Sequence, residues 1–152
     1  SLFFFSNCGF EPIYSSHNKN NEELLHISVK NIKDRAGQIL KNDLSKKLNP
    51  QNKKTITKYY LFVDLSENIE ETGIRKDMSA TRANLKINAE YKLLTVKDAE
   101  IILKSSIEAL SSYDIVESIY ATIIAEKDAR NKGLKIISDS IINELAIYFS
   151  NK

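Results

Sequence analysis

Strict alternation of apolar and polar residues marks the clearest element of the chain. Apolar side chains occupy every second position from Ala83 to Leu93, and polar side chains fill the positions between them. A period of two is typical of a strand with one buried and one exposed face. The same period, over shorter runs, predicts three further strands at residues 25–29, 59–65 and 99–109.

Two other stretches follow a helical period. Apolar residues recur at three- and four-residue spacing between Asp34 and Leu48, where Asp34 is expected to cap the helix and Pro50 to end it. A second, longer helix is predicted over residues 118–149, with Gly133 as a weak point in its middle. Its apolar stripe consists of Ile119, Ile123, Ala129, Leu134, Ile137, Ile141, Leu145 and Tyr148.

The connections complete a β-α-β-β-β-α order. Residues 96–98 form a tight connection, so the last two strands are expected to pair as an antiparallel hairpin. Residues 66–79 are charged and contain Gly73, which predicts a longer loop. Four strands with one polar face and two amphipathic helices predict an α+β fold, a two-layer sandwich. We expect a four-stranded, mainly antiparallel sheet with both helices on one face.

The sheet face turned away from the helices is the most informative predicted surface. Its expected positions mix aromatic, aliphatic and basic side chains. They are Lys58, Tyr60, Phe62, Arg82, Lys86, Lys92, Ile102, Lys104 and Leu110. Scattered exposed apolar side chains are normal on protein surfaces, which is one interpretation. The other is a face covered by another protein or by a negatively charged, amphiphilic ligand.

Composition narrows the class of protein. The 152 residues are 42% hydrophobic and 28% charged, which is ordinary for one globular domain, and the net charge of +2 is too small to demand a nucleic-acid partner. The sequence has no Gly-rich phosphate loop, GxSxG elbow or HExxH motif, and His17 and His26 have no other ligands at metal spacing. We therefore expect a protein that is not an enzyme and has no metal or cofactor.

The N-terminal segment SLFFFSNCGFEPIY contains the only cysteine, Cys8. Residues 2–5 resemble the end of the hydrophobic segment of a signal peptide, and the small Ser6 follows them. In bacterial lipoproteins, a cysteine directly after the cleavage point receives diacylglycerol on its sulfur. Residues 5–8 fit that pattern loosely, and a cysteine buried in an N-terminal strand is the alternative.

These observations divide the chain into three predicted parts. Residues 1–7 are the end of a signal peptide, 8–23 a lipidated N-terminus and polar tether, and 24–149 a single α+β domain. No apolar run after residue 10 approaches the roughly 20 residues that span a bilayer. A link to a membrane is therefore expected from the first few residues.

Several segments, in their order and spacing, agree with the predicted β-α-β-β-β-α pattern. They are CGFEPIY at 8–14, DRAGQILKNDL at 34–44, SATR at 79–82, SY at 112–113, YAT at 120–122, AEKDA at 125–129 and LAIYF at 145–149. Together they resemble a shorter branch of the LPS-assembly lipoprotein family, LptE. The resemblance extends over nearly all of the chain from Cys8 onward.

The resemblance implies an anchor and a non-catalytic role. Cys8 would be the lipidated first residue of the mature protein and would hold it at the periplasmic face of the outer membrane. Gly9 lacks the aspartate that signals retention in the inner membrane. The family also implies a plug within the lumen of the LptD β-barrel, help in assembling that barrel, and a part in delivering lipopolysaccharide to the cell surface.

Phosphorylated lipid A would favour lysine and arginine donors on such a plug. Strand parity predicts these donors as Arg82, Lys86 and Lys92, with Arg75 and Lys76 in the long loop as a second cluster. The alternative is that these residues are solubilising charges or contacts with the barrel.

Two rival functions remain open. A helix, three strands and a helix is also the order of a double-stranded-RNA-binding domain, and residues 126–135 are a basic stretch within a helix. That domain is about half this length, however, and Glu126 and Asp128 would repel phosphates. We therefore expect no nucleic-acid partner. An unrelated periplasmic scaffold lipoprotein would share the anchor and lack a barrel partner.

Overall fold

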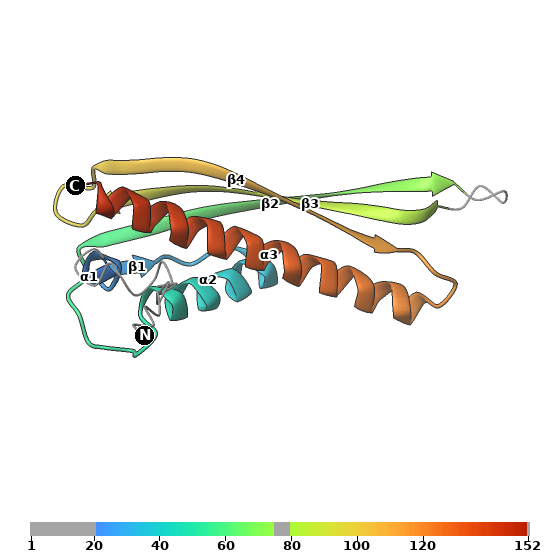
Figure 1. Ribbon diagram of the computed structural model, residues 1–152, viewed down its shortest axis with the longest axis horizontal. Helices are drawn as coiled ribbons and strands as arrows, with labels where there is room; N and C mark the ends of the chain where they lie inside the picture. Colours follow the sequence, from blue (N-terminus) through green and yellow to red (C-terminus); the bar gives the residue numbers. More distant parts are fainter. Residues whose placement is uncertain (1–20, 75–79, 152) are drawn as a thin grey trace, which may run out of the picture.

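Seven elements build an elongated molecule of two layers (Figure 1). The computed structural model describes residues 21–74 and 80–151. The elements are α1 (Asn21–Leu24), β1 (Ile27–Val29), α2 (Asp34–Leu48), β2 (Tyr59–Ile74), β3 (Ala80–Thr95), β4 (Ile101–Asp114) and α3 (Ile119–Ser150). The short helix α1 begins inside the segment that was expected to be a tether.

The four strands form one sheet in the order β1-β2-β3-β4. β1 is parallel to β2, and the other two neighbouring pairs are antiparallel. Both long helices, α2 and α3, lie on the same side of this sheet (Figure 1). The predicted α+β sandwich with two helices on one face is therefore confirmed.

The β2–β3 ribbon is much longer than the sequence pattern indicates. Its register runs from the Tyr59–Thr95 pair to the Ile74–Ala80 pair, so the predicted loop at 66–79 is wrong for residues 66–74. All side chains from 66 to 71 are exposed. With neither face buried, this part of β2 has no apolar alternation, and backbone hydrogen bonds to β3 hold it in the sheet.

A β-bulge changes which side chains of β4 face the helices. Leu93 pairs with Leu103 while Leu94 pairs with Ile101, so Ile102 is an extra residue in the ladder. Ile101 is consequently 50% exposed, and Ile102 packs against the core. The alternation that predicts a strand at 99–109 would bury Ile101 and expose Ile102, because it contains no sign of the shift.

Both long helices have the predicted bounds to within a residue, but the start of α2 differs from expectation. Asp34 does not cap α2: the N-cap position is Lys33, without a side-chain hydrogen bond, and Asp34 has a φ of 68°. A short polar side chain makes this left-handed conformation tolerable. The start of α3 is capped by Ser118, whose side chain accepts a hydrogen bond from the backbone N–H of Ala121.

The predicted apolar stripe of α3 is buried only from Ala129 onward. Ile119 is 77% exposed and Ile123 is 55% exposed. The first turns of α3 extend past the end of α2, so no second helix covers them (Figure 1). Gly133 is not a weak point: it is buried, and a Cβ at this position would lie 2.9 Å from the Ile87 Cδ1 atom. The glycine lets the helix approach β3 closely.

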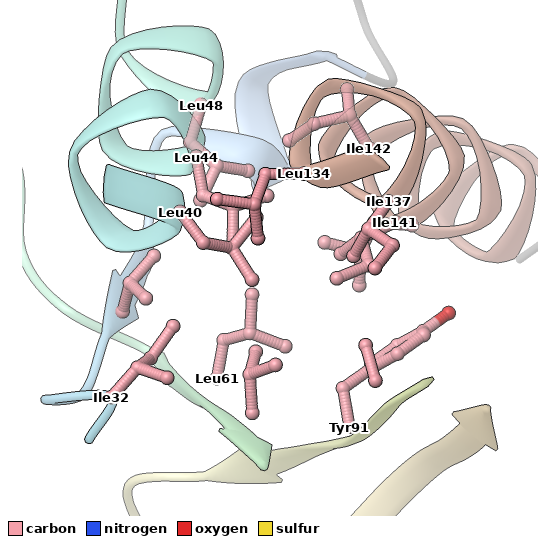
Figure 2. Packing of buried hydrophobic residues seen from close by; sticks show 14 of the residues in the cluster. Ile32, Leu40, Leu44, Leu48, Leu61, Tyr91, Leu134, Ile137, Ile141 and Ile142 are labelled. Atoms are coloured by element: carbon pink, nitrogen blue, oxygen red, sulfur yellow. The ribbon is translucent and has the colours of Figure 1, made fainter. Parts of the chain in front are cut away.

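The core lies between the two long helices and the inner face of the sheet. Leucines of α2 meet isoleucines of α3 above β2 and β3, and the ring of Tyr91 lies among them (Figure 2). The fully buried members shown there include Leu40, Leu44, Leu61, Ile137 and Ile141.

Polar contacts fasten the helices at the margins of this core. Lys47 on α2 donates to Ser138 and forms an ion pair with Asp139, both on α3. Arg130 on α3 donates to the carboxylate of Glu67 on β2. These contacts fix α3 against α2 at one point and against the β2–β3 ribbon at another.

Gly37 should tolerate an added methyl group poorly. A Cβ at this buried position would lie 2.7 Å from the backbone carbon and oxygen of Ile32, which cannot move independently. We expect Gly37→Ala to lower the free energy of unfolding by about 1–3 kcal/mol, measured by urea denaturation. Gly133→Ala is the matched control, because its methyl group meets only the flexible tip of Ile87. A loss at Gly133 as large as that at Gly37 would contradict this account.

Stability should decline at alkaline pH. Burial is the larger cause, and a hydrogen bond to Glu144 the smaller one, that raises the pKa of Tyr91 well above its usual range. Burial and a hydrogen bond to Glu23 raise the pKa of Tyr59 to about 12. The unfolded chain releases these protons near pH 10 while the folded protein keeps them, so stability is lost as pH rises above about 10.

Urea denaturation between about pH 8 and pH 11 measures this loss, with the double variant Tyr59→Phe/Tyr91→Phe as the comparison. The variant should lose less stability over this interval than the parent protein. An identical slope in both proteins would show that other groups cause the decline.

Candidate binding surface on the outer sheet face

The helix-free face of the sheet holds the three basic residues predicted on the long strand. In β3 the side chains at odd positions from Ala83 to Leu93 are buried, and those at even positions point the other way. Arg82 and Lys92 are exposed on this outer face, and Lys86 is half-buried. The other predicted site residues, Cys8, Arg75 and Lys76, lie outside the described residues.

These three cations do not form one cluster. Ten residues of extended strand separate Arg82 from Lys92, a distance of about 33 Å. Arg82 lies across from Asp114 in the register with β4. Lys86 forms an ion pair with Glu108, with 3.4 Å between Nζ and Oε1. Each of these two residues therefore has a carboxylate close by on the neighbouring strand.

Lys92 has different surroundings. Its Nζ lies 5.5 Å from the centre of the Phe62 ring, and Lys104 is its cross-strand partner on β4. Beside them, Lys30 places its Nζ 4.2 Å from the centre of the Tyr60 ring. We call these five residues the basic–aromatic patch. It occupies the end of the outer face nearest β1.

The patch concentrates positive charge, and the exposed carboxylates of Asp64 and Glu90 lie two residues further along β2 and β3 on the same face. Two lysines directly opposite each other on adjacent strands repel, which costs stability. Among the ion pairs of residues 21–74 and 80–151, none includes Lys92 or Lys104. The aromatic rings beneath two of the ammonium groups give weak cation–π attraction and leave their N–H donors available.

Apolar side chains adjoin the patch. Leu94 pairs with Tyr60 and with Ile101, which is 50% exposed because of the bulge. Ammonium groups beside exposed apolar and aromatic side chains suit a ligand that carries both a phosphate and hydrocarbon. This arrangement can bind such an amphiphile, and it offers no nucleophile paired with a base for catalysis.

Sequence reasoning placed four of the five members of the patch on the correct face but did not connect them with Lys30. These four are Tyr60, Phe62, Lys92 and Lys104. Lys30 follows β1, and the parallel pairing of Val29 with Leu61 brings it beside the ring of Tyr60. The order of strands in a sheet is a long-range property. No local pattern in the sequence could have indicated this contact.

Residues 21–74 and 80–151 show neither a metal site nor a membrane-spanning helix. They contain no group of three or more histidine, cysteine, aspartate or glutamate side chains arranged to hold a metal ion. Within the same part of the chain, no helix is both long enough and apolar enough to cross a membrane.

Comparison with known proteins gives similarity in structure only. No family model matches the chain, and no curated protein does. A candidate lipoprotein from Caulobacter crescentus has a TM-score of 0.70 at 22% identity, covering 88% of this chain and 97% of that one. Rare lipoprotein B from Shewanella oneidensis has a TM-score of 0.64 at 15% identity, covering 82% and 96%.

A minor lipoprotein from Acinetobacter baumannii is similar in the same way. Its TM-score is 0.62 at 12% identity, and the match covers 80% of this chain and 90% of that one. At such low identities these likenesses establish a common fold. They extend over most of both chains in each pair, so the whole sandwich is shared and not one motif within it.

Proposed function

We propose that this chain is an outer-membrane lipoprotein of the LptE kind. It acts without catalysis, as plug and assembly partner of an LptD-type β-barrel in the transport of lipopolysaccharide to the cell surface. The observation that carries the proposal is the fold, which is shared over most of the chain with lipoproteins of three other bacteria. It joins an independent line of support, the resemblance of the sequence segments to the LptE family.

Cys8 is the proposed point of attachment to the membrane. Its sulfur would carry the lipid, and residues 9–20 would join the anchor to the described domain. A single acyl chain gives only marginal membrane binding, whereas several chains on one cysteine hold a protein firmly. The domain itself would lie at the periplasmic face of the outer membrane.

The shape and surface of the domain suit a plug. The lumen of an outer-membrane barrel is polar but enclosed, so its occupant needs a surface of mixed character. The outer sheet face alternates charged, polar and apolar side chains, and the side chains of β2 from 66 to 71 are exposed on both sides of that strand. A strand segment with little buried apolar surface gains little from packing within its own domain. Contact with the surrounding barrel wall would give this segment a role.

The basic–aromatic patch is the proposed contact for lipopolysaccharide. Lys92 and Lys104 would donate to a phosphate of lipid A, with the ring of Phe62 and the exposed side of Ile101 beside its hydrocarbon. This assignment retains Lys92 from the residues predicted on the strand. It replaces Lys86, which is paired with Glu108, and Arg82, which lies across from Asp114 in the strand register.

Copurification tests the proposed function. We expect the tagged full-length protein, extracted gently from outer membranes of a Gram-negative host, to bring down a large β-barrel identified by mass spectrometry. The N-terminal peptide should carry diacylglycerol on Cys8. The Cys8→Ala variant should lack the lipid and leave the outer-membrane fraction. Lipidation without a barrel would favour an unrelated scaffold lipoprotein, and unmodified Cys8 in a soluble protein would reject the proposal.

Lipopolysaccharide binding should depend on where positive charge is removed. We expect Lys92→Gln/Lys104→Gln to weaken binding by roughly tenfold, because two charge-assisted hydrogen bonds are lost. Arg82→Gln/Lys86→Gln removes the same charge from the same face and should change the affinity little. Equal loss in both variants would indicate a nonspecific charge effect, and unchanged affinity in both would remove the lipid site.

A further inference from the structure

A cleft of about 810 Å³ opens between α1, the C-terminal end of α2 and the C-terminal half of α3. Its apolar lining consists of Leu24, Leu25, Leu48, Pro50, Ile142 and Ala146. The volume is in the range of natural ligand sites, which are usually apolar with a few polar groups at the edge. The outer sheet face is separate from it, because α2 and α3 cover the opposite side of the sheet (Figure 1).

One edge of the cleft carries an exposed lysine whose backbone is held in place. The side chain of Asn49 donates to the carbonyl of Lys53 over 2.8 Å and accepts from its backbone N–H over 3.0 Å. These two bonds hold the backbone of Lys53 at the rim, where its side chain is exposed. The other rim lysine, Lys47, is already engaged with Asp43 and Asp139.

The described chain begins at this cleft. Asn21 is the first residue of α1, and Glu22, Leu24 and Leu25 belong to the lining. Residues 15–20 separate α1 from the segment Gly9–Tyr14, and six extended residues span at most about 20 Å. The segment GFEPIY is therefore tethered within reach of the cleft at a high effective concentration.

The chemistry of this segment matches the cleft. Phe10, Ile13 and Tyr14 supply apolar side chains, and Glu11 supplies a negative charge to meet Lys53. Pro12 follows Glu11, and a residue before proline prefers an extended backbone, which suits a peptide lying along a groove.

We propose that residues 10–14 of this chain dock in the cleft, with the three apolar side chains against its lining and Glu11 beside Lys53. The consequence for the anchor rests on the proposed function. Docking would place the lipidated Cys8 at the α1 end of the molecule, and the free end of the β2–β3 ribbon at the opposite end would point away from the membrane (Figure 1).

Disulfide trapping in the 152-residue chain tests the docking, with Cys8→Ser as the background. The trapping pair is Ile13→Cys with Gln51→Cys, an exposed residue of the cleft rim. The control pair is Ile13→Cys with Val96→Cys. Val96 is 40% exposed and lies outside the cleft lining. It is still near α1, because its backbone N–H donates to the carbonyl of Lys58, and the N–H of Lys58 donates to the carbonyl of His26. We expect the trapping pair to oxidise about tenfold faster than the control pair.

Charge reversal identifies the segment as the occupant. Lys53→Glu should slow the trapping, and Glu11→Lys combined with Lys53→Glu should restore it. Equal rates for the two cysteine pairs would overturn the proposal. A disulfide-linked dimer whose yield falls on dilution would assign the cleft to a second copy and overturn it too. The protein in this test is unlipidated and free of a barrel, so its result is independent of the copurification result.

Discussion

The packing of α2 and α3 against a single face of the sheet determines where every other surface of this protein lies. Leu40 and Leu44 meet Ile137 and Ile141 over the inner side of β2 and β3, where Tyr91 of β3 also lies (Figure 2). The helices leave the side chains of β2 from 66 to 71 uncovered, although Ala83, Leu85 and Ile87 on the paired part of β3 are buried. The outer face, this part of β2 and the first turns of α3 are exposed. Those exposed parts are where we place the functions of the molecule.

The same core explains which features the sequence could predict. Wherever one side of an element is buried, its period is visible, as in β3, in α2 and in α3 beyond Ala129. The strand at 66–74 was not predicted because the side chains of β2 from 66 to 71 are exposed on both sides of the strand. The bulge at Ile102 was not predicted because it shifts the register without altering the alternation that follows it.

The candidate site was predictable only in part, for a related reason. Parity placed Lys92 and Lys104 on the outer face, but it could not reveal which cations have carboxylates beside them. The parallel pairing of β1 with β2 adds Lys30 to the patch, and the ion pair with Glu108 removes Lys86 from consideration. Local patterns therefore give a set of candidate residues on the outer face, and the pairing of strands distant in sequence decides which of them can bind a ligand.

Photo-cross-linking in living cells tests most directly whether this domain works inside a β-barrel, as we propose. A photoreactive residue at Leu110, which is 60% exposed on the outer sheet face, should form an adduct with a single outer-membrane β-barrel protein. A probe at buried Leu44 should form none. Adducts from position 110 that contain only periplasmic proteins, or no adduct while this protein is present in the outer membrane, would contradict the account.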